Sequence, residues 1–118
     1  MLHTWIDGMP ADAVAVDDRG LNYADGAFET LRCRRGQILC SDLHETRLTL
    51  GLSRLAFPNA NGLAEGVFAT AHQLLSGVGH SGVARLTVTR GSGQRGYTPE
   101  FDAKPRSILV EQSDRGIE

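Results

Sequence analysis

The segment from residue 90 to residue 97 holds side chains that could bind an anion. Its glycines match the letters of the dinucleotide-binding motif G-x-G-x-x-G, but that motif must open a helix and be followed by an acidic residue about 20 positions later. Here Pro99 follows closely, and the segment does not begin a helix. We therefore interpret it as part of a ligand-binding loop that presents Arg90, Arg95 and Tyr97, because the guanidinium fork suits carboxylates and phosphates.

Arg47 is a second candidate anion ligand, in a helix expected from residue 42 to residue 55. At about 100° per residue, this arginine falls within an arc of leucines and outside the polar face. The leucines of that arc are Leu43, Leu48, Leu50 and Leu55. A buried guanidinium needs an anionic partner, and phosphate fits its bidentate geometry. Two alternatives stay open at this point: an inward, phosphate-binding Arg47, or a side chain that reaches solvent at the domain edge.

The chain has a single lysine, Lys104, against eleven arginines. The four histidines share no spacing typical of a metal site. No serine, histidine and acid form a pattern that suggests a catalytic triad. The sequence therefore indicates neither a metal site nor a triad hydrolase.

Composition is that of one globular domain. With 118 residues, 41% apolar and 22% charged, the chain is long enough to bury a core and is neither disordered nor membrane-spanning in character. The formal net charge of −2 argues against nucleic-acid binding. Cys33 and Cys40 are too few for a disulfide framework, so we expect free thiols in the cytoplasm. No export signal marks the N-terminus.

The elements that must position these residues are short strands and two helices. We expect strands at residues 2–6, around Met9, and at 13–16, 27–34, 37–40, 83–89 and 107–110, and helices at 42–55 and 61–78. A two-residue turn at Arg35-Gly36 places Cys33 opposite Ile38. The prediction is an α+β, two-layer domain: a mostly antiparallel sheet of about six strands with two helices on one face.

Taken together, the motifs resemble the N-terminal domain of the class IV aminotransferase family, the fold-type IV pyridoxal-phosphate enzymes. The matching residues run through nearly the whole chain in the family's order. They are Trp5-Ile6-Asp7-Gly8, Asp18-Arg19-Gly20, Asp25-Gly26, Phe28-Glu29, His44-Glu45-Thr46-Arg47-Leu48, Thr89-Arg90-Gly91 and Arg95-Gly96-Tyr97.

The resemblance implies pyridoxal 5'-phosphate as cofactor, with Arg47 holding its phosphate and Phe28 near the cofactor. It also implies that Arg95 and Tyr97 meet the carboxylates of a small-molecule substrate. Within the family, the loop resembles that of the 4-amino-4-deoxychorismate lyases, which release pyruvate and leave 4-aminobenzoate for folate synthesis. A D-amino-acid or branched-chain aminotransferase is the alternative, as is a non-catalytic domain that binds an anion or a partner.

The same resemblance places the cofactor-binding lysine in a second, C-terminal domain, whereas Lys104 lies in the substrate loop. Residues 1–118 are therefore expected to be the N-terminal domain, inactive without the other. The complete enzyme is expected to be a cytoplasmic homodimer.

Overall fold

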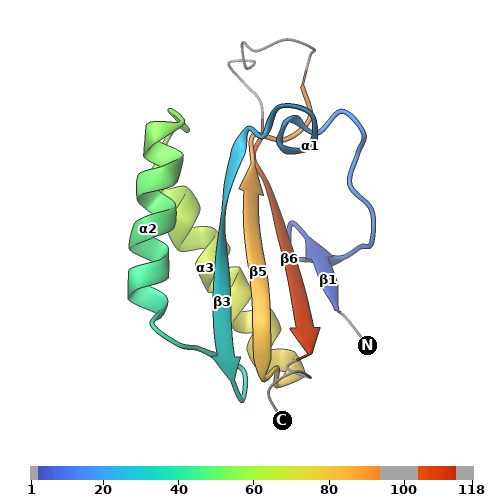
Figure 1. The fold of residues 1–118 in the computed structure, drawn as a ribbon, viewed down its shortest axis with the longest axis vertical. Helices are drawn as coiled ribbons and strands as arrows, with labels where there is room; N and C mark the ends of the chain where they lie inside the picture. The colour runs from blue at the N-terminus through green and yellow to red at the C-terminus, as the bar shows by residue number, and fades with distance from the viewer. Residues whose placement is uncertain (1–2, 94–103, 114–118) are drawn as a thin grey trace.

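The computed structural model describes residues 3–93 and 104–113. Six antiparallel strands form one sheet in the order β2-β1-β6-β5-β3-β4, with three helices (Figure 1). The elements are β1 (Thr4–Ile6), β2 (Met9–Pro10), α1 (Arg19–Tyr23), β3 (Gly26–Arg34), β4 (Gln37–Ile38), α2 (Ser41–Arg54), α3 (Ala60–Val78), β5 (Gly82–Thr89) and β6 (Arg106–Ser113). The α+β prediction is confirmed.

The three long strands β3, β5 and β6 give the sheet two different faces. Leu31, Leu86 and Leu109 point to the face that α2 and α3 cover, and each is at most 4% exposed. Alternate residues point to the opposite face, which no helix covers along most of its length (Figure 1). On that open face Phe28 pairs with Thr87 in the neighbouring strand β5. The sheet therefore has a packed side and an accessible side.

Helix α2 buries a narrower stripe than predicted. Leu48 and Leu52 are at most 1% exposed, whereas Leu43 is 73% and Leu50 52% exposed. The helix packs against α3 and β3, so only residues spaced by four on one side meet the core. The prediction that Leu43 and Leu50 share a buried arc with Arg47 is wrong.

The N-terminal third differs from the prediction between residues 11 and 25. Residues 13–16 do not form a strand, and Val16 is 84% exposed. Helix α1 follows, with the Asp18 side chain accepting a hydrogen bond from the backbone N–H of Leu21 at 3.1 Å. Apolar alternation alone predicted the strand, but residues 13–16 pair with none of the strands of the sheet.

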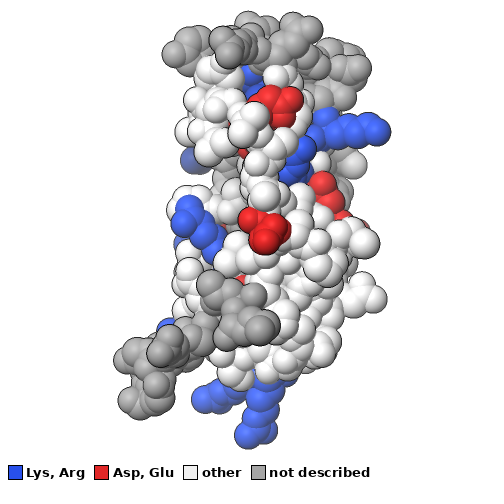
Figure 2. Space-filling view, turned by 90° about the vertical axis from the view of Figure 1, so that its right-hand side faces the viewer, with Lys and Arg blue, Asp and Glu red and all other residues white. Residues whose placement is uncertain are grey.

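Among the described residues, none of the helices has the length and hydrophobicity that a membrane span needs. On the face seen in Figure 2, acidic and basic side chains are scattered over a largely uncharged surface.

Candidate functional site

The open face of the sheet is hollowed next to α1, where β3 begins and β5 ends. The hollow has a volume of about 410 Å³ and is open to solvent. Its lining includes Val14, Leu21, Phe28, Arg85, Thr87 and Ile108. We call it the open-face hollow. Apolar walls with a few polar groups are typical of small-molecule sites, and its size falls in their usual range.

Phe28 lies in this hollow with 52% of its surface exposed. The guanidinium carbon of Arg85 lies 3.9 Å from the centre of the Phe28 ring, so the cation stacks on the ring face. The role of Phe28 beside a cofactor stays a prediction. Its position next to an open, apolar space is compatible with that role.

Arg47 is held by a carboxylate from the sheet. Its Nε donates to both oxygens of Glu29 at 3.1 Å, and its Nη2 donates to Oε1 at 2.8 Å. The Nδ1 atom of His44 lies 2.7 Å from the same oxygen. The side chain of Glu29 is only 6% exposed, whereas that of Arg47 is 69% exposed. Of the two alternatives left open for Arg47, the structure therefore shows the side chain that reaches solvent and contradicts the inward, buried one.

The protonation of this cluster follows from its contacts. Burial raises the pKa of Glu29, but the hydrogen bonds from Arg47 and His44 outweigh it and bring that pKa below its ordinary value. Hydrogen bonding to Glu29 in turn raises the pKa of Arg47. Glu29 is thus an anion that fixes the Nε and Nη2 edge of the guanidinium. Among the described residues Nη1 has no hydrogen-bond partner, so one edge of Arg47 remains open to an external anion.

Phe28 and Glu29 are consecutive in β3, so their side chains lie on opposite faces of the sheet. From Gly26 to Arg32 this strand has a ladder partner only on its β5 side, within the described part of the chain. The Arg47 cluster and the open-face hollow therefore flank the same free edge of β3.

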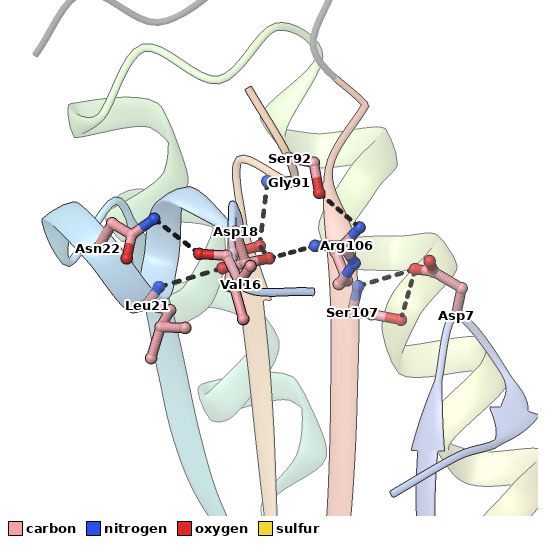
Figure 3. Close-up of polar contacts among 10 residues, drawn as sticks. Asp7, Val16, Asp18, Leu21, Asn22, Gly91, Ser92, Arg106 and Ser107 are labelled. Atoms are coloured by element: carbon pink, nitrogen blue, oxygen red, sulfur yellow. Dashed lines mark hydrogen bonds and ion pairs between the residues drawn. The ribbon is translucent and has the colours of Figure 1, made fainter. Parts of the chain in front are cut away.

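Asp18 ties the walls of the hollow together (Figure 3). One of its oxygens caps α1, and the other accepts from the hydroxyl of Thr89 at 2.8 Å and from Nη1 of Arg106 at 2.5 Å. Nη2 of Arg106 donates to the hydroxyl of Ser92 at 3.0 Å. This network connects α1, the end of β5 and the beginning of β6, and it fixes both described ends of the predicted substrate loop.

Asp25 forms a second buried hub. Its Oδ2 accepts from Nε of Arg19 and from Nε of Arg90, each at 2.9 Å. Burial raises the pKa of Asp25, but the two arginines outweigh it and lower that pKa below its ordinary value. Arg90 also donates to the carbonyl of Leu55 at 2.5 Å and stacks on Phe57 at 4.2 Å. The interpretation that Arg90 is presented to a ligand is wrong, because its contacts are structural.

Arg95 and Tyr97 lie outside the described residues, so their contact with substrate carboxylates stays a prediction. Sequence reasoning quoted Asp25 and Glu29 only as parts of family motifs, without a role, and it did not single out Arg85. Asp25 precedes a glycine and was interpreted as a turn residue, and this interpretation gave no indication of its ion pairs. The sequence did contain a signal for Arg85. It lies in the alternating strand from residue 83 to residue 89, so its side chain is on the face opposite the apolar Leu86.

Comparison with known proteins identifies a matching family and several similar proteins. A family model described as amino-transferase class IV matches residues 26–116. The aminodeoxychorismate lyase of Vibrio harveyi is 30% identical over 98 residues, which are 80% of this chain and 34% of the relative. The 4-amino-4-deoxychorismate lyase of Pseudomonas aeruginosa is 42% identical, with a TM-score of 0.82 over 93% of this chain and 39% of that one.

Aminotransferases of the same fold are also similar. The fold IV transaminase CpuTA1 of Curtobacterium pusillum is 28% identical, with a TM-score of 0.60 over 87% of this chain and 34% of that one. The branched-chain amino acid aminotransferase of Escherichia coli, 19% identical with a TM-score of 0.67, shares the fold. The chain spans between a third and two fifths of the length of these relatives. The chain therefore belongs to the class IV aminotransferase family.

Proposed function

We propose that this chain is the N-terminal part of a pyridoxal-phosphate-dependent lyase that converts 4-amino-4-deoxychorismate to 4-aminobenzoate and pyruvate. The observation that carries the proposal is the match to the Pseudomonas aeruginosa lyase, at 42% identity over 93% of the chain. The transaminase match covers a similar share of the chain at 28% identity.

The residues at the edge of β3 fit the phosphate of the cofactor. Arg47 is exposed and carries an unshared Nη1 edge, while Glu29 and His44 hold the opposite edge in a set orientation. A rigidly held guanidinium loses less conformational entropy on binding than a mobile one. When bound, pyridoxal phosphate supplies an electron-accepting ring. In this proposal Arg47 binds the phosphate, Glu29 orients Arg47, and the apolar walls around Phe28 contact the substrate.

The chemistry also requires a lysine that binds the cofactor covalently and an acid that pairs with its ring nitrogen. Lys104 is exposed and lies at the end of the predicted substrate loop. We propose that neither group belongs to these 118 residues, so that activity requires the longer protein. Treatment of the 118-residue chain with pyridoxal phosphate and borohydride tests this, since a specific adduct on Lys104 would contradict it.

The complete enzyme is proposed to be a cytoplasmic homodimer acting on a small carboxylate-bearing substrate. The exposed Leu43 and Leu50 of α2 offer apolar surface for contact with further protein. The free thiols of Cys33 and Cys40 suit a reducing compartment.

The direct test uses the protein that continues these 118 residues to the length of the relatives. It is incubated with 4-amino-4-deoxychorismate, and formation of 4-aminobenzoate and pyruvate is followed. A parallel reaction contains D-alanine or a branched-chain amino acid with 2-oxoglutarate. We expect the two lyase products in equal amounts. Transamination without lyase activity would instead support the second candidate, a fold-type IV aminotransferase, which the similarity to CpuTA1 favours.

A further inference from the structure

The residue that ends α1 has a backbone conformation that favours glycine, although it is an alanine. Ala24 has φ 53° and ψ 33°, in the left-handed region, where a Cβ atom is crowded by the following carbonyl group. Glycine adopts this conformation without that cost. Ala24 therefore carries local backbone strain, and such strain in a folded protein points to a constraint imposed by its surroundings or by function.

The surrounding contacts explain the backbone conformation of Ala24 but not its side chain. The backbone N–H groups of Ala24 and Asp25 both donate to the carbonyl oxygen of Arg19, which closes the last turn of α1. Asp25 is held in turn by its ion pairs with Arg19 and Arg90. These contacts fix left-handed backbone at residue 24, and they use only main-chain atoms of Ala24. Glycine at this position could make all of them.

The strained alanine lies at the wall of the open-face hollow. Six described residues other than glycine have a positive φ, and they are Asp7, Ala24, Arg35, Cys40, Ala56 and Asn59. Among these six, only Ala24 lines the open-face hollow, and it is exposed there. Backbone strain and a place in the lining of the hollow therefore coincide at this residue, which favours a functional reason for the methyl group.

Two glycines in the same lining have a structural reason instead. A Cβ atom at Gly20 would overlap the side chain of Thr89, and a Cβ atom at Gly26 would overlap the carbonyl oxygen of Val88. Both glycines are therefore needed where α1 and β3 pack closely against β5. At residue 24 the relation is reversed, because the backbone favours glycine and a methyl group is nevertheless present next to the hollow.

We propose that the methyl group of Ala24 determines which ligands fit the end of the open-face hollow next to α1. It contacts an apolar part of the ligand and excludes ligands that carry one more methyl group at that point. The inference rests on the proposed function for the identity of the ligand, whose ring is then that of 4-aminobenzoate. Removal of the methyl group relaxes the backbone and opens space at the wall, so stability is expected to rise while selectivity falls.

The test compares Ala24→Gly with the matched control Ala56→Gly. Ala56 follows α2 with φ 61°, is exposed, and is not among the residues that line the hollow, so the same replacement relieves the same kind of strain there. In the 118-residue chain, each variant is expected to raise the midpoint of urea denaturation by about 0.5 M. The rise is expected because relief of the strain exceeds the entropy that glycine adds to the unfolded chain. The same measurement establishes that both variants are folded.

Selectivity is measured in the longer protein, as dissociation constants for 4-aminobenzoate and its two ring-methylated analogues, 4-amino-2-methylbenzoate and 4-amino-3-methylbenzoate. In the unaltered protein, at least one analogue is expected to bind about 10-fold more weakly than 4-aminobenzoate, which is the discrimination that one methyl group gives in an apolar site. Ala24→Gly is expected to reduce that ratio about 5-fold or more, whereas Ala56→Gly leaves it unchanged.

The two proposals fail in different ways. If neither analogue gains affinity relative to 4-aminobenzoate in Ala24→Gly, or if Ala56→Gly changes the ratio equally, the selectivity role of Ala24 is overturned even in an active lyase. If the longer protein binds none of the three acids and only transaminates, the lyase assignment fails. The variants are then compared by kcat/KM for D-alanine and D-2-aminobutyrate, which is longer by one methylene. Ala24→Gly is expected to shift this preference about 5-fold toward the longer amino acid, and an unchanged preference overturns the role of Ala24.

Discussion

Replacement of Asp25 by asparagine is expected to destabilise the fold strongly, although the side chain lies in a turn. The single oxygen Oδ2 accepts hydrogen bonds from Arg19 and Arg90, whose side chains are 2% and 10% exposed. Asparagine has nearly the same shape and can still offer one oxygen to both donors. The change therefore removes mainly the negative charge that these two buried guanidinium groups share.

The magnitude follows from that loss of charge. Hydrogen bonds to charged groups contribute about 1.5–3 kcal/mol each and are roughly twice as strong as neutral ones, so two of them lose about 1.5–3 kcal/mol in total. Breaking a buried ion pair by removing one partner costs about 3–5 kcal/mol. The side chain of Asp25 is 10% exposed, so solvent screening reduces these values only slightly. We expect Asp25→Asn to lower the free energy of unfolding by about 3 kcal/mol.

Urea denaturation followed by far-UV circular dichroism measures this directly. With a slope of about 1.5 kcal/mol per molar urea, the midpoint falls by about 2 M. Asp12→Asn is the matched control, because Asp12 is exposed and close in sequence; its effect is expected to stay within about 0.5 kcal/mol. If Asp25→Asn and Asp12→Asn unfold within about 0.5 kcal/mol of each other, the reasoning on the buried hub is refuted.

Two further predictions concern ionisation. The pKa values of Asp25 and Glu29 are lowered on folding, so both groups stabilise the fold above their unfolded values near pH 4, and this contribution is lost as pH falls through the folded values. The free energy of unfolding measured in urea is thus expected to decline below about pH 4. This decline is expected to be less steep in Glu29→Gln, and an equal dependence on pH in the variant and the unaltered protein would contradict the prediction. Burial raises the pKa of the Cys33 thiol, whereas Cys40 is exposed. Ellman's reagent is expected to modify Cys40 rapidly and Cys33 only on unfolding, so two fast thiols in native protein would contradict the buried position of Cys33.

Local patterns in the sequence were enough to predict most elements of the fold. The turns at residues 7–8 and 35–36 have positive φ at both central positions, as two-residue hairpins require. Cys33 lies opposite Ile38, as that turn predicts. Helices α2 and α3 were located by apolar spacing and by the breaks at Pro58 and the glycines after residue 76.

The predictions that were wrong depend on contacts between residues far apart in the sequence. Val14 and Val16 alternate as strand residues do, but pairing depends on a free sheet edge, which periodicity does not report. A helical wheel shows which residues share a side of α2, but not how wide the covered stripe is. That width depends on where α3 and β3 lie, and it leaves Leu50 exposed. Arg90 was assigned to a ligand because its partner Asp25 is 65 residues away in the sequence.

The most direct test of the account concerns the phosphate preference of Arg47 in the longer protein. The ratio of the affinities for pyridoxal phosphate and for pyridoxal, measured by quenching of intrinsic fluorescence, isolates the contribution of the phosphate group. Arg47→Gln is expected to lower this ratio at least 10-fold, while Arg54→Gln, at the exposed last turn of the same helix, leaves it unchanged. An unchanged ratio in a folded Arg47→Gln protein would contradict the assignment of Arg47 as the phosphate ligand.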